Sequence, residues 1–225
     1  MDSSKLEKEI GVEFKNKNLL KEALTHRSYL NENPSWGQHN ERMEFLGDSV
    51  LELITSDFLY KKYPGRNEGD LTVLRAALIN YQMLAQVARE IDLENYILLS
   101  KGEAKDTGKG REAILADAFE ALLAAIYLDR GYEIAEGFIL KFLLPHLEEI
   151  EKKQLYRDPK SFLQEMIQEQ SKVTPTYQVL EESGPDHQKI FRVGVYVNEK
   201  LIAEGKGLSK QEAEVNAAGQ ALSSL

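Results

Sequence analysis

Apolar residues recur at helical spacing through most of the first 150 residues. At about 100° per residue this pattern predicts amphipathic or fully buried helices at 17–30, 41–62, 71–91 and 113–129. Turn-forming residues separate these segments, at 33–34, 64–65 and 101–110. A further helix is expected to begin near Tyr132 and to end or kink at Pro145. No segment here alternates as a strand does, so the pattern predicts a helical unit.

The pattern changes near residue 157. Asp158 followed by Pro159 is typical of a helix start. Three segments of strand composition with short turns between them follow, at 176–183, 189–198 and 200–207. Ser209 and Glu212 then have the spacing of a capping box, which predicts a last helix. The order is helix, three antiparallel strands, helix, which predicts a small α+β unit with both helices on one face of the sheet. We therefore predict two domains, 1–152 and 157–225.

The composition is that of a soluble globular protein, with 42% hydrophobic and 29% charged residues. No run of eighteen apolar residues occurs and the N-terminus lacks a signal pattern, so we expect no membrane association and a cytoplasmic location. The chain has no cysteine, which excludes disulfides, iron–sulfur clusters and thiolate zinc sites.

The charge of the chain argues against a strongly basic nucleic-acid binder. The net charge is −9, of which −7 falls on residues 1–156 and −2 on the remainder. Any affinity for a polyanion therefore has to come from local positive patches, helix N-termini or bound divalent cations.

Two acids stand in an otherwise apolar helix. In AILADAFEALLAAIYL, residues 113–128, all but Asp117 and Glu120 are apolar, so we expect this helix to be buried on every side. Burying an unpaired carboxylate costs several kcal/mol, and a second one nearby worsens it. A basic partner from elsewhere, protonation with a raised pKa, or a divalent cation could each compensate.

A second acidic stripe lies in NERMEFLGDSVLELI, residues 40–54. Glu41, Glu44 and Asp48 fall within about 60° of one another on a helix. Taken alone, this stripe is more typical of a solvated face, because Glu52 lies on it as well. If it packs against the 113–128 helix, four or more carboxylates converge without His or Cys, which favours Mg²⁺ or Mn²⁺ over zinc. A cation held in this way serves phosphoryl chemistry.

Three motifs resemble one known family. NERMEFLGDS is similar to the signature of the ribonuclease III family, endonucleases that cut double-stranded RNA, and ILADAFEALLAAIYLDRG is similar to its second acidic motif. GPDHQKIF and GKGLSKQEAEVNAA resemble a double-stranded-RNA-binding domain. The resemblance covers nearly the whole chain. It implies an all-α helical endonuclease domain followed by a small α+β (α-β-β-β-α) RNA-binding domain.

The resemblance also implies roles for individual acids. Those expected to bind Mg²⁺, for which Mn²⁺ can substitute, are Glu44, Asp48, Asp117 and Glu120. Glu41 and Glu68 resemble two further acids near the cleavage centre, although Glu68 can also be read as a helix-start acid ahead of Leu71. Members of the family are homodimers through the helical domain. They process rRNA and mRNA precursors and leave 5′-phosphates, 3′-hydroxyls and two-nucleotide 3′ overhangs.

The second domain offers three places to contact an A-form duplex, which small domains recognise mainly by shape. The first helix presents Ser161, Gln164, Glu165 and Gln168. The turn carrying His187 can reach a second minor groove, and the start of the last helix offers phosphate contacts from Lys206, Ser209 and Lys210. Many members of the family carry a second lysine where this chain has Gln211, which predicts one weaker phosphate contact.

The residues argue against two other function classes. A double-stranded-RNA-binding dimer that cuts nothing would have the same domains, but all four ligand positions are filled by Asp or Glu. A helical di-iron or di-manganese oxidase needs Glu-x-x-His pairs, and none of the motif glutamates is followed by a His at that spacing.

Overall fold

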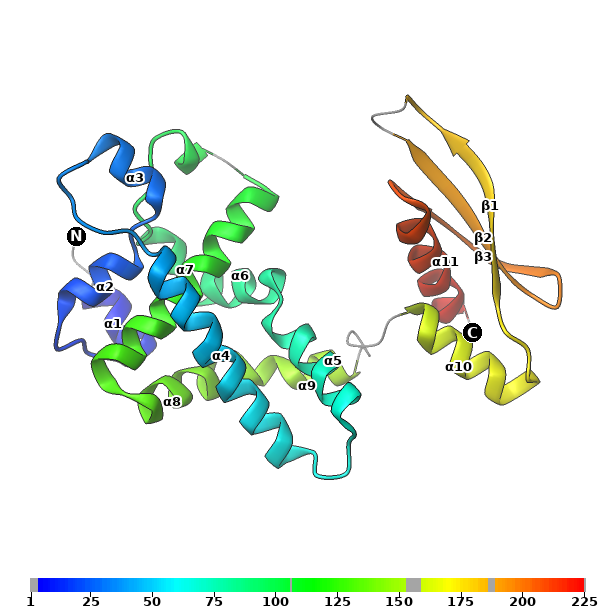
Figure 1. Ribbon diagram of the computed structural model, residues 1–225, viewed down its shortest axis with the longest axis horizontal. Coiled ribbons are helices and arrows are strands. Elements are labelled where there is room, and N and C mark those ends of the chain that lie inside the picture. Colours follow the sequence, from blue (N-terminus) through cyan, green and yellow to red (C-terminus); the bar gives the residue numbers. More distant parts are fainter. Residues whose placement is uncertain (1–3, 106, 153–158, 186–188, 225) are drawn as a thin grey trace. The chain divides into compact units, whose positions relative to one another are not determined.

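The chain forms two compact units, residues 1–156 and 157–225 (Figure 1). The structure is a computed structural model and describes residues 4–105, 107–152, 159–185 and 189–224. The secondary structure consists of a helical unit followed by an α+β unit, as the sequence predicted. Each unit is described by itself.

The first unit is helical throughout its regular elements. Its α-helices are α1 (Ser4–Ile10), α2 (Lys17–Ala23), α3 (Arg27–Glu32), α4 (Glu41–Lys62), α5 (Glu68–Ile79), α6 (Tyr81–Glu90), α7 (Lys109–Arg130), α8 (Tyr132–Phe142) and α9 (Leu147–Lys152). Short 3₁₀ turns are η1 (Leu93–Asn95), η2 (Glu103–Lys105) and η3 (Leu144–His146). Pro145 lies in η3 between α8 and α9, so the predicted end or kink at this proline is confirmed.

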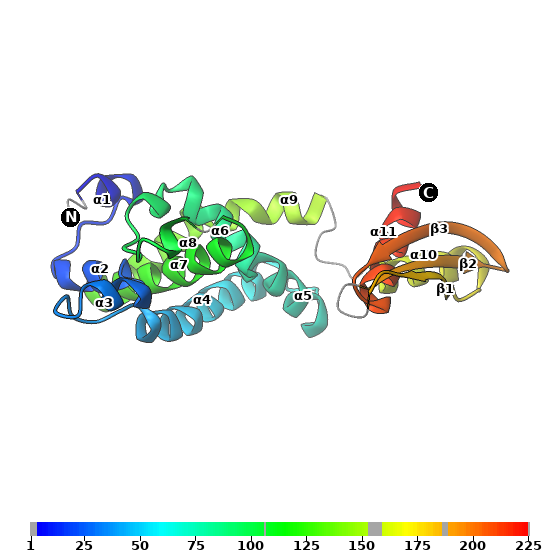
Figure 2. The ribbon, with the colours of Figure 1, turned by 90° about the horizontal axis from the view of Figure 1, so that it is seen from above.

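Helix α7 is the centre of this unit, with α4 along one side and α6 along another (Figure 1 and Figure 2). From Ile114 to Ile126 every residue is buried except the half-buried Asp117 and Glu120. The prediction that this helix is buried on every side is wrong for its last turn, where Leu128 is 51% exposed. The apolar run thus marks a true core helix whose C-terminal end reaches the surface.

Two of the predicted helices are divided. Within 17–30 the helical pattern is interrupted because Leu24 and His26 make backbone hydrogen bonds with Leu98, so α2 and α3 are separate. Within 71–91 the break falls at Asn80, whose side chain caps α6 by accepting from the Met83 N–H at 3.0 Å. In both cases the helix ends at a hydrogen bond that cannot be predicted from the spacing of apolar residues.

The second unit is a three-stranded antiparallel sheet with two helices on one face (Figure 1). Its elements are α10 (Pro159–Ser171), β1 (Thr176–Ser183), β2 (Ile190–Val197), β3 (Lys200–Gly207) and α11 (Lys210–Ser224). Leu163 and Ile167 of α10 pack with Val195 of β2 and with alanines of α11. A side chain at Gly205 would collide with the backbone of α11, so this glycine lets the helix lie directly on β3.

Candidate functional site

The acidic stripe of α4 and the acids of α7 lie at a point where the two helices nearly touch. A Cβ atom built on Gly47 of α4 would stand 1.9 Å from the main-chain oxygen of Glu120 on α7. Glu44 lies three residues before Gly47 and Asp48 directly after it. The backbone contact therefore brings these two side chains and Glu120 into one neighbourhood.

The electrostatics of these acids show that the two segments meet. Burial, followed by the charges of Asp48, Asp117 and Glu44, raises the pKa of Glu120 to about 8. Burial, followed by Asp117, Glu41 and Asp48, raises the pKa of Glu44. Burial and then Glu41 raise the pKa of Asp117. Acids more than sixty residues apart in sequence therefore form one cluster, called here the carboxylate cluster: Glu44, Asp48, Asp117 and Glu120.

No basic side chain neutralises this cluster in the part of the chain that the structure describes. The ion pairs found there involve other acids. Of the three ways to compensate buried carboxylates, a basic partner is thus excluded for residues 4–105, 107–152, 159–185 and 189–224. Protonation and a divalent cation remain.

The donor set of the cluster fits a hard divalent cation. Carboxylate oxygens without nitrogen or sulfur ligands are what Mg²⁺ and Mn²⁺ prefer. Among the described residues, no three His, Asp or Glu side chains already converge closely enough to form a finished metal site. The fit therefore rests on the chemistry of four neighbouring carboxylates, three of which have a raised pKa.

Glu41 differs from the four acids of the cluster because basic side chains lie beside it. Its Oε1 lies 3.3 Å from Nη1 of Arg27, and its Oε2 lies 3.8 Å from Nδ1 of His39. It nevertheless stands close enough to the cluster to raise the pKa of Asp117.

The structure does not bring Glu68 to the cluster within one chain. Glu68 lies in the first turn of α5 and accepts a hydrogen bond from the Thr72 hydroxyl at 3.0 Å. That turn follows the far end of α4, about 20 Å along the helix from Asp48 at 1.5 Å per residue. The expectation that Glu68 lies near the cleavage centre therefore fails for a single chain, and its place agrees with the helix-start reading.

The four polar residues predicted to contact RNA on α10 are all exposed: Ser161, Gln164, Glu165 and Gln168. Ser161 and Gln164 line a hollow of about 360 Å³ together with Gln211 of α11. The position that departs from the family pattern thus lies beside the predicted minor-groove contacts. This places a neutral amide where a second lysine would have added positive charge.

The start of α11 contains the predicted capping box. The Glu212 N–H donates to the Ser209 hydroxyl at 3.1 Å, and the Glu212 carboxylate accepts from the Leu208 N–H at 2.7 Å. Lys210 is exposed, and its ammonium lies 5.8 Å from the ring of Phe191. His187 lies outside the described residues.

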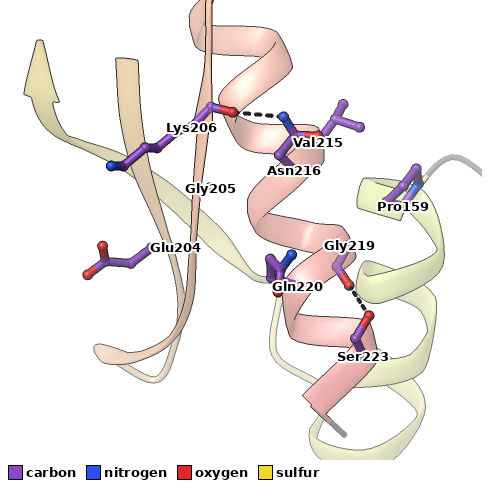
Figure 3. A pocket seen from close by; sticks show the side chains of 9 residues that line it. All are labelled: Pro159, Glu204, Gly205, Lys206, Val215, Asn216, Gly219, Gln220 and Ser223. Atoms are coloured by element: carbon purple, nitrogen blue, oxygen red, sulfur yellow. Dashed lines mark hydrogen bonds between the residues drawn. The ribbon is translucent and has the colours of Figure 1, made fainter. Parts of the chain in front are cut away.

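Lys206 borders a hollow of about 600 Å³ between β3, α11 and the start of α10 (Figure 3). Its carbonyl oxygen accepts a hydrogen bond from the Asn216 amide at 2.7 Å, which fixes the backbone of β3 against α11. The side chain points away from α11 and leaves its ammonium exposed. Lys206, Ser209 and Lys210 are therefore held within one short stretch of surface.

Gly47 was not singled out from the sequence. A glycine inside a 22-residue helix is the signal that could have found it, because glycine weakens a helix interior and needs a compensating reason. The compensating reason is the contact between α4 and α7.

Family comparisons match both units of the chain. A family model described as Ribonuclease-III-like matches residues 16–147, and the double-stranded RNA binding motif matches residues 159–225. The chain belongs to the ribonuclease III family. It is accordingly an endoribonuclease for double-stranded RNA with a nuclease domain and an RNA-binding domain.

Relatives with the name Ribonuclease 3 match almost the full chain. That of Borreliella afzelii is 46% identical over 216 residues, covering 96% of this chain and 88% of the relative. That of Protochlamydia amoebophila is 47% identical over 218 residues, covering 97% and 90%. The solved nuclease domain of ribonuclease III from Campylobacter jejuni has a TM-score of 0.59 at 42% identity, covering 64% of this chain and 97% of that one.

The Campylobacter jejuni structure is described as flexible in a region involved in dimer formation of its nuclease domain.

None of the helices that the structure of the present chain describes is long and apolar enough to cross a membrane.

Proposed function

We propose that the carboxylate cluster is the centre where phosphodiester bonds of double-stranded RNA are hydrolysed, with Mg²⁺ as the resident cation and Mn²⁺ as a substitute. The observation that supports this most is the meeting of acids from α4 and α7 without a basic partner among the described residues. Burial, together with the charges of the neighbouring acids, raises the pKa of Glu120 to about 8. A site that holds protons this tightly also has a strong electrostatic preference for a divalent cation.

The cluster residues act as ligands in this proposal. Bound Mg²⁺ supplies neutralisation of a phosphodiester oxygen and acidification of an attacking water. Asp48 and Glu44 from α4 and Asp117 and Glu120 from α7 would hold the cation. The rigid contact at Gly47 fixes the distance between the two pairs of ligands. We propose products with 5′-phosphates, 3′-hydroxyls and two-nucleotide 3′ overhangs.

We propose that the RNA-binding unit places the duplex through its two helices. Ser161, Gln164, Glu165 and Gln168 face solvent on α10, where they can exchange hydrogen bonds with 2′-hydroxyl groups. Lys206, Ser209 and Lys210 offer phosphate contacts, and His187 remains a prediction for the second minor groove. The proposed substrates are precursors of rRNA and mRNA, and the proposed location is the cytoplasm.

A homodimer through the helical domain is supported by an exposed apolar face of α4. Phe45, Leu53 and Tyr60 are 78%, 58% and 73% exposed, and they fall within about 80° of one another around the helix. An interface between two identical copies needs a surface that is complementary to itself. A cavity of about 700 Å³ lined by Leu59, Tyr60 and Leu71 lies at the other end of α4 from Phe45 and is the surface that we propose receives this face.

The same pairing gives Glu68 a place near the cleavage centre. Glu68 lines the cavity that would receive Phe45, and Phe45 follows Glu44 directly in sequence. If the Phe45 ring of one copy enters the cavity of the second copy, the Glu68 of that second copy comes close to Glu41 and Glu44. We therefore propose that each catalytic centre receives Glu68 from the other subunit.

Cleavage itself is tested with an RNA duplex of about 30 base pairs, longer than the roughly 16 that one RNA-binding domain spans. We expect the full chain to cut this duplex with Mg²⁺, to leave it intact with EDTA, and to spare the separate single strands. Asp48→Asn is expected to bind the duplex without cutting it. Binding without cleavage by the unmodified chain would instead support the non-catalytic RNA-binding dimer.

The dimer is tested with Phe45→Glu, measured by light scattering over a range of concentrations. A charge placed at the centre of an apolar contact is expected to raise the dimer dissociation constant by at least about 30-fold, as loss of an interface hot spot does. Leu140→Glu changes another exposed apolar residue, on α8, and serves as the control. An unmodified chain that is monomeric, or a Phe45→Glu dimer as tight as the unmodified one, would refute this interface.

A further inference from the structure

The cationic side chain of Arg27 stands at the edge of the carboxylate cluster. Nη1 of Arg27 lies 3.3 Å from Oε1 of Glu41. Burial, and then Asp117 and Glu41, raise the pKa of Glu44, and burial and Glu41 raise that of Asp117. Glu41 lies one helical turn before Glu44 on α4, so Arg27 stands at the edge of the cluster with the Glu41 side chain between them. Helix α3, which begins with Arg27, lies next to the start of α4 in both views (Figure 1 and Figure 2).

The backbone that carries Arg27 is fixed on both sides. The His26 N–H donates to the Leu98 carbonyl at 3.1 Å. The Ser28 hydroxyl accepts from the Ser100 N–H at 3.0 Å and lies 2.8 Å from Nδ1 of His26. The side chain of Arg27 is nevertheless 71% exposed. A rigid base with an exposed tip is the arrangement of a side chain that meets a ligand from solvent.

Arg27 places a permanent positive charge beside Glu41. Burial lowers the pKa of His26, so that imidazole is neutral near neutral pH. A guanidinium has five N–H donors and keeps its charge throughout the working pH range. The contact with Glu41 leaves other donors of Arg27 pointing to solvent. The guanidinium of Arg192 differs, because it lies between two carboxylates, 3.1 Å from Glu181 and 3.0 Å from Glu204.

We propose that Arg27 binds a phosphate of the RNA strand that enters the carboxylate cluster, and that Glu41 is the positioning residue that orients Arg27, not a metal ligand. The proposal rests on the proposed function of the cluster. Its physical reason is that a polyanion approaches a unit with a net charge of −7 only where a local cation attracts it. An arginine can hold a carboxylate and a phosphate at once through different N–H groups.

Binding of the RNA duplex in the absence of metal tests the role of Arg27 independently of the cleavage reaction. The measurement is the affinity of the full-length chain for the duplex in EDTA, in a Glu120→Gln background, over a range of salt concentrations. We expect Arg27→Ala to weaken binding about 3- to 10-fold and to reduce the slope of log affinity against log salt by about 1, as loss of one phosphate contact does. Arg27→Lys should keep the slope and lose less affinity.

Arg89→Ala is the matched control, because Arg89 is also a partly exposed arginine paired with a carboxylate, 3.8 Å from Glu112. It is expected to leave affinity and slope unchanged. Glu41→Gln should lower affinity while keeping the slope, and it should cause no further loss once Arg27 is alanine. That non-additivity is the signature of a residue that acts through another.

Cleavage measured with Glu120 retained completes the test. Arg27→Ala should raise KM several-fold and leave the Mg²⁺ concentration for half-maximal cleavage unchanged. A wild-type salt slope in Arg27→Ala would overturn the phosphate contact. A shifted Mg²⁺ requirement in Glu41→Gln would overturn the positioning role and make Glu41 a ligand. If the unmodified chain fails to cut at all, the proposed function fails, and the binding measurements in EDTA still decide for or against Arg27.

Discussion

Glu120→Gln is expected to abolish cleavage of double-stranded RNA while leaving the fold intact. The substitution keeps the size of the side chain but removes the charge of one of the four proposed metal ligands. Changing groups that merely support a metal ligand already costs about 10- to 100-fold in activity, so loss of the ligand should exceed about 100-fold. Binding of the duplex in EDTA should be unchanged, since the RNA-binding unit is untouched.

The stability of the metal-free chain provides a second measurement on the same variant. Burial and neighbouring acids raise the pKa of Glu120 from 4.5 to about 8 in the folded chain. The contribution of this group to stability is therefore fully present below the unfolded value and is lost as pH rises toward the folded value. Glutamine cannot ionise, so in EDTA the variant should melt about 2–4 °C higher than the unmodified chain above pH 8, and this gain should shrink near pH 5.

Glu112→Gln is the control, because it makes the same change on the first turn of the same helix, where Glu112 faces Arg89. It should keep full cleavage and show no comparable gain in melting temperature at high pH. A Glu120→Gln variant that cuts RNA normally, or that unfolds more readily in EDTA at high pH, would contradict the placement of Glu120 in a repelling cluster.

Gly47→Ala is expected to destroy activity by separating α4 from α7. The added methyl group would stand 1.9 Å from the main-chain oxygen of Glu120, a distance at which backbone has to move. Forcing extra atoms into a packed contact costs about 1–3 kcal/mol, which outweighs the gain of about 1 kcal/mol from replacing glycine in a helix. Displacement of ligands by about 1 Å can lower the rate about 100-fold.

Gly137→Ala gives the matched comparison for this prediction. Gly137 also lies inside a helix, α8, but a Cβ atom there would meet nothing within 4 Å. It should stabilise the chain by about 0.5–1 kcal/mol in thermal or urea unfolding and leave cleavage unchanged. Equal effects of the two alanines on cleavage would show that the spacing of α4 and α7 does not control the site.

Much of the fold follows from local sequence signals. The predicted helix 41–62 has the bounds of α4, and the strand segments 176–183 and 200–207 have those of β1 and β3. These elements carry strong patterns of their own, with apolar residues at a regular period and turns at each end. Local pattern is enough where no distant partner interferes.

The sequence-based predictions were wrong or incomplete where a residue distant in sequence determines the local structure. Leu98 interrupts the helix predicted at 17–30 by pairing with the backbone of Leu24 and His26, from more than seventy residues away. The carboxylate cluster was predicted only on the condition that two helices pack together, and the residue that lets them do so, Gly47, carries no chemical group to attract notice. Glu68 shows a third kind of limit, because in the proposed dimer it would act at the centre of the second copy, which a single chain does not contain.

The burial of α7 bears on how the molecule loses activity under stress. Amides in a helix surrounded by packed side chains open only when the whole cooperative unit opens, whereas short peripheral helices such as α1 and α9 can fray alone. Since Asp117 and Glu120 project from that helix, partial melting at the periphery leaves them in place. Heat or denaturant should thus abolish cleavage activity in one cooperative step, at the same temperature or concentration at which the nuclease domain unfolds. A gradual loss of activity before unfolding is not expected.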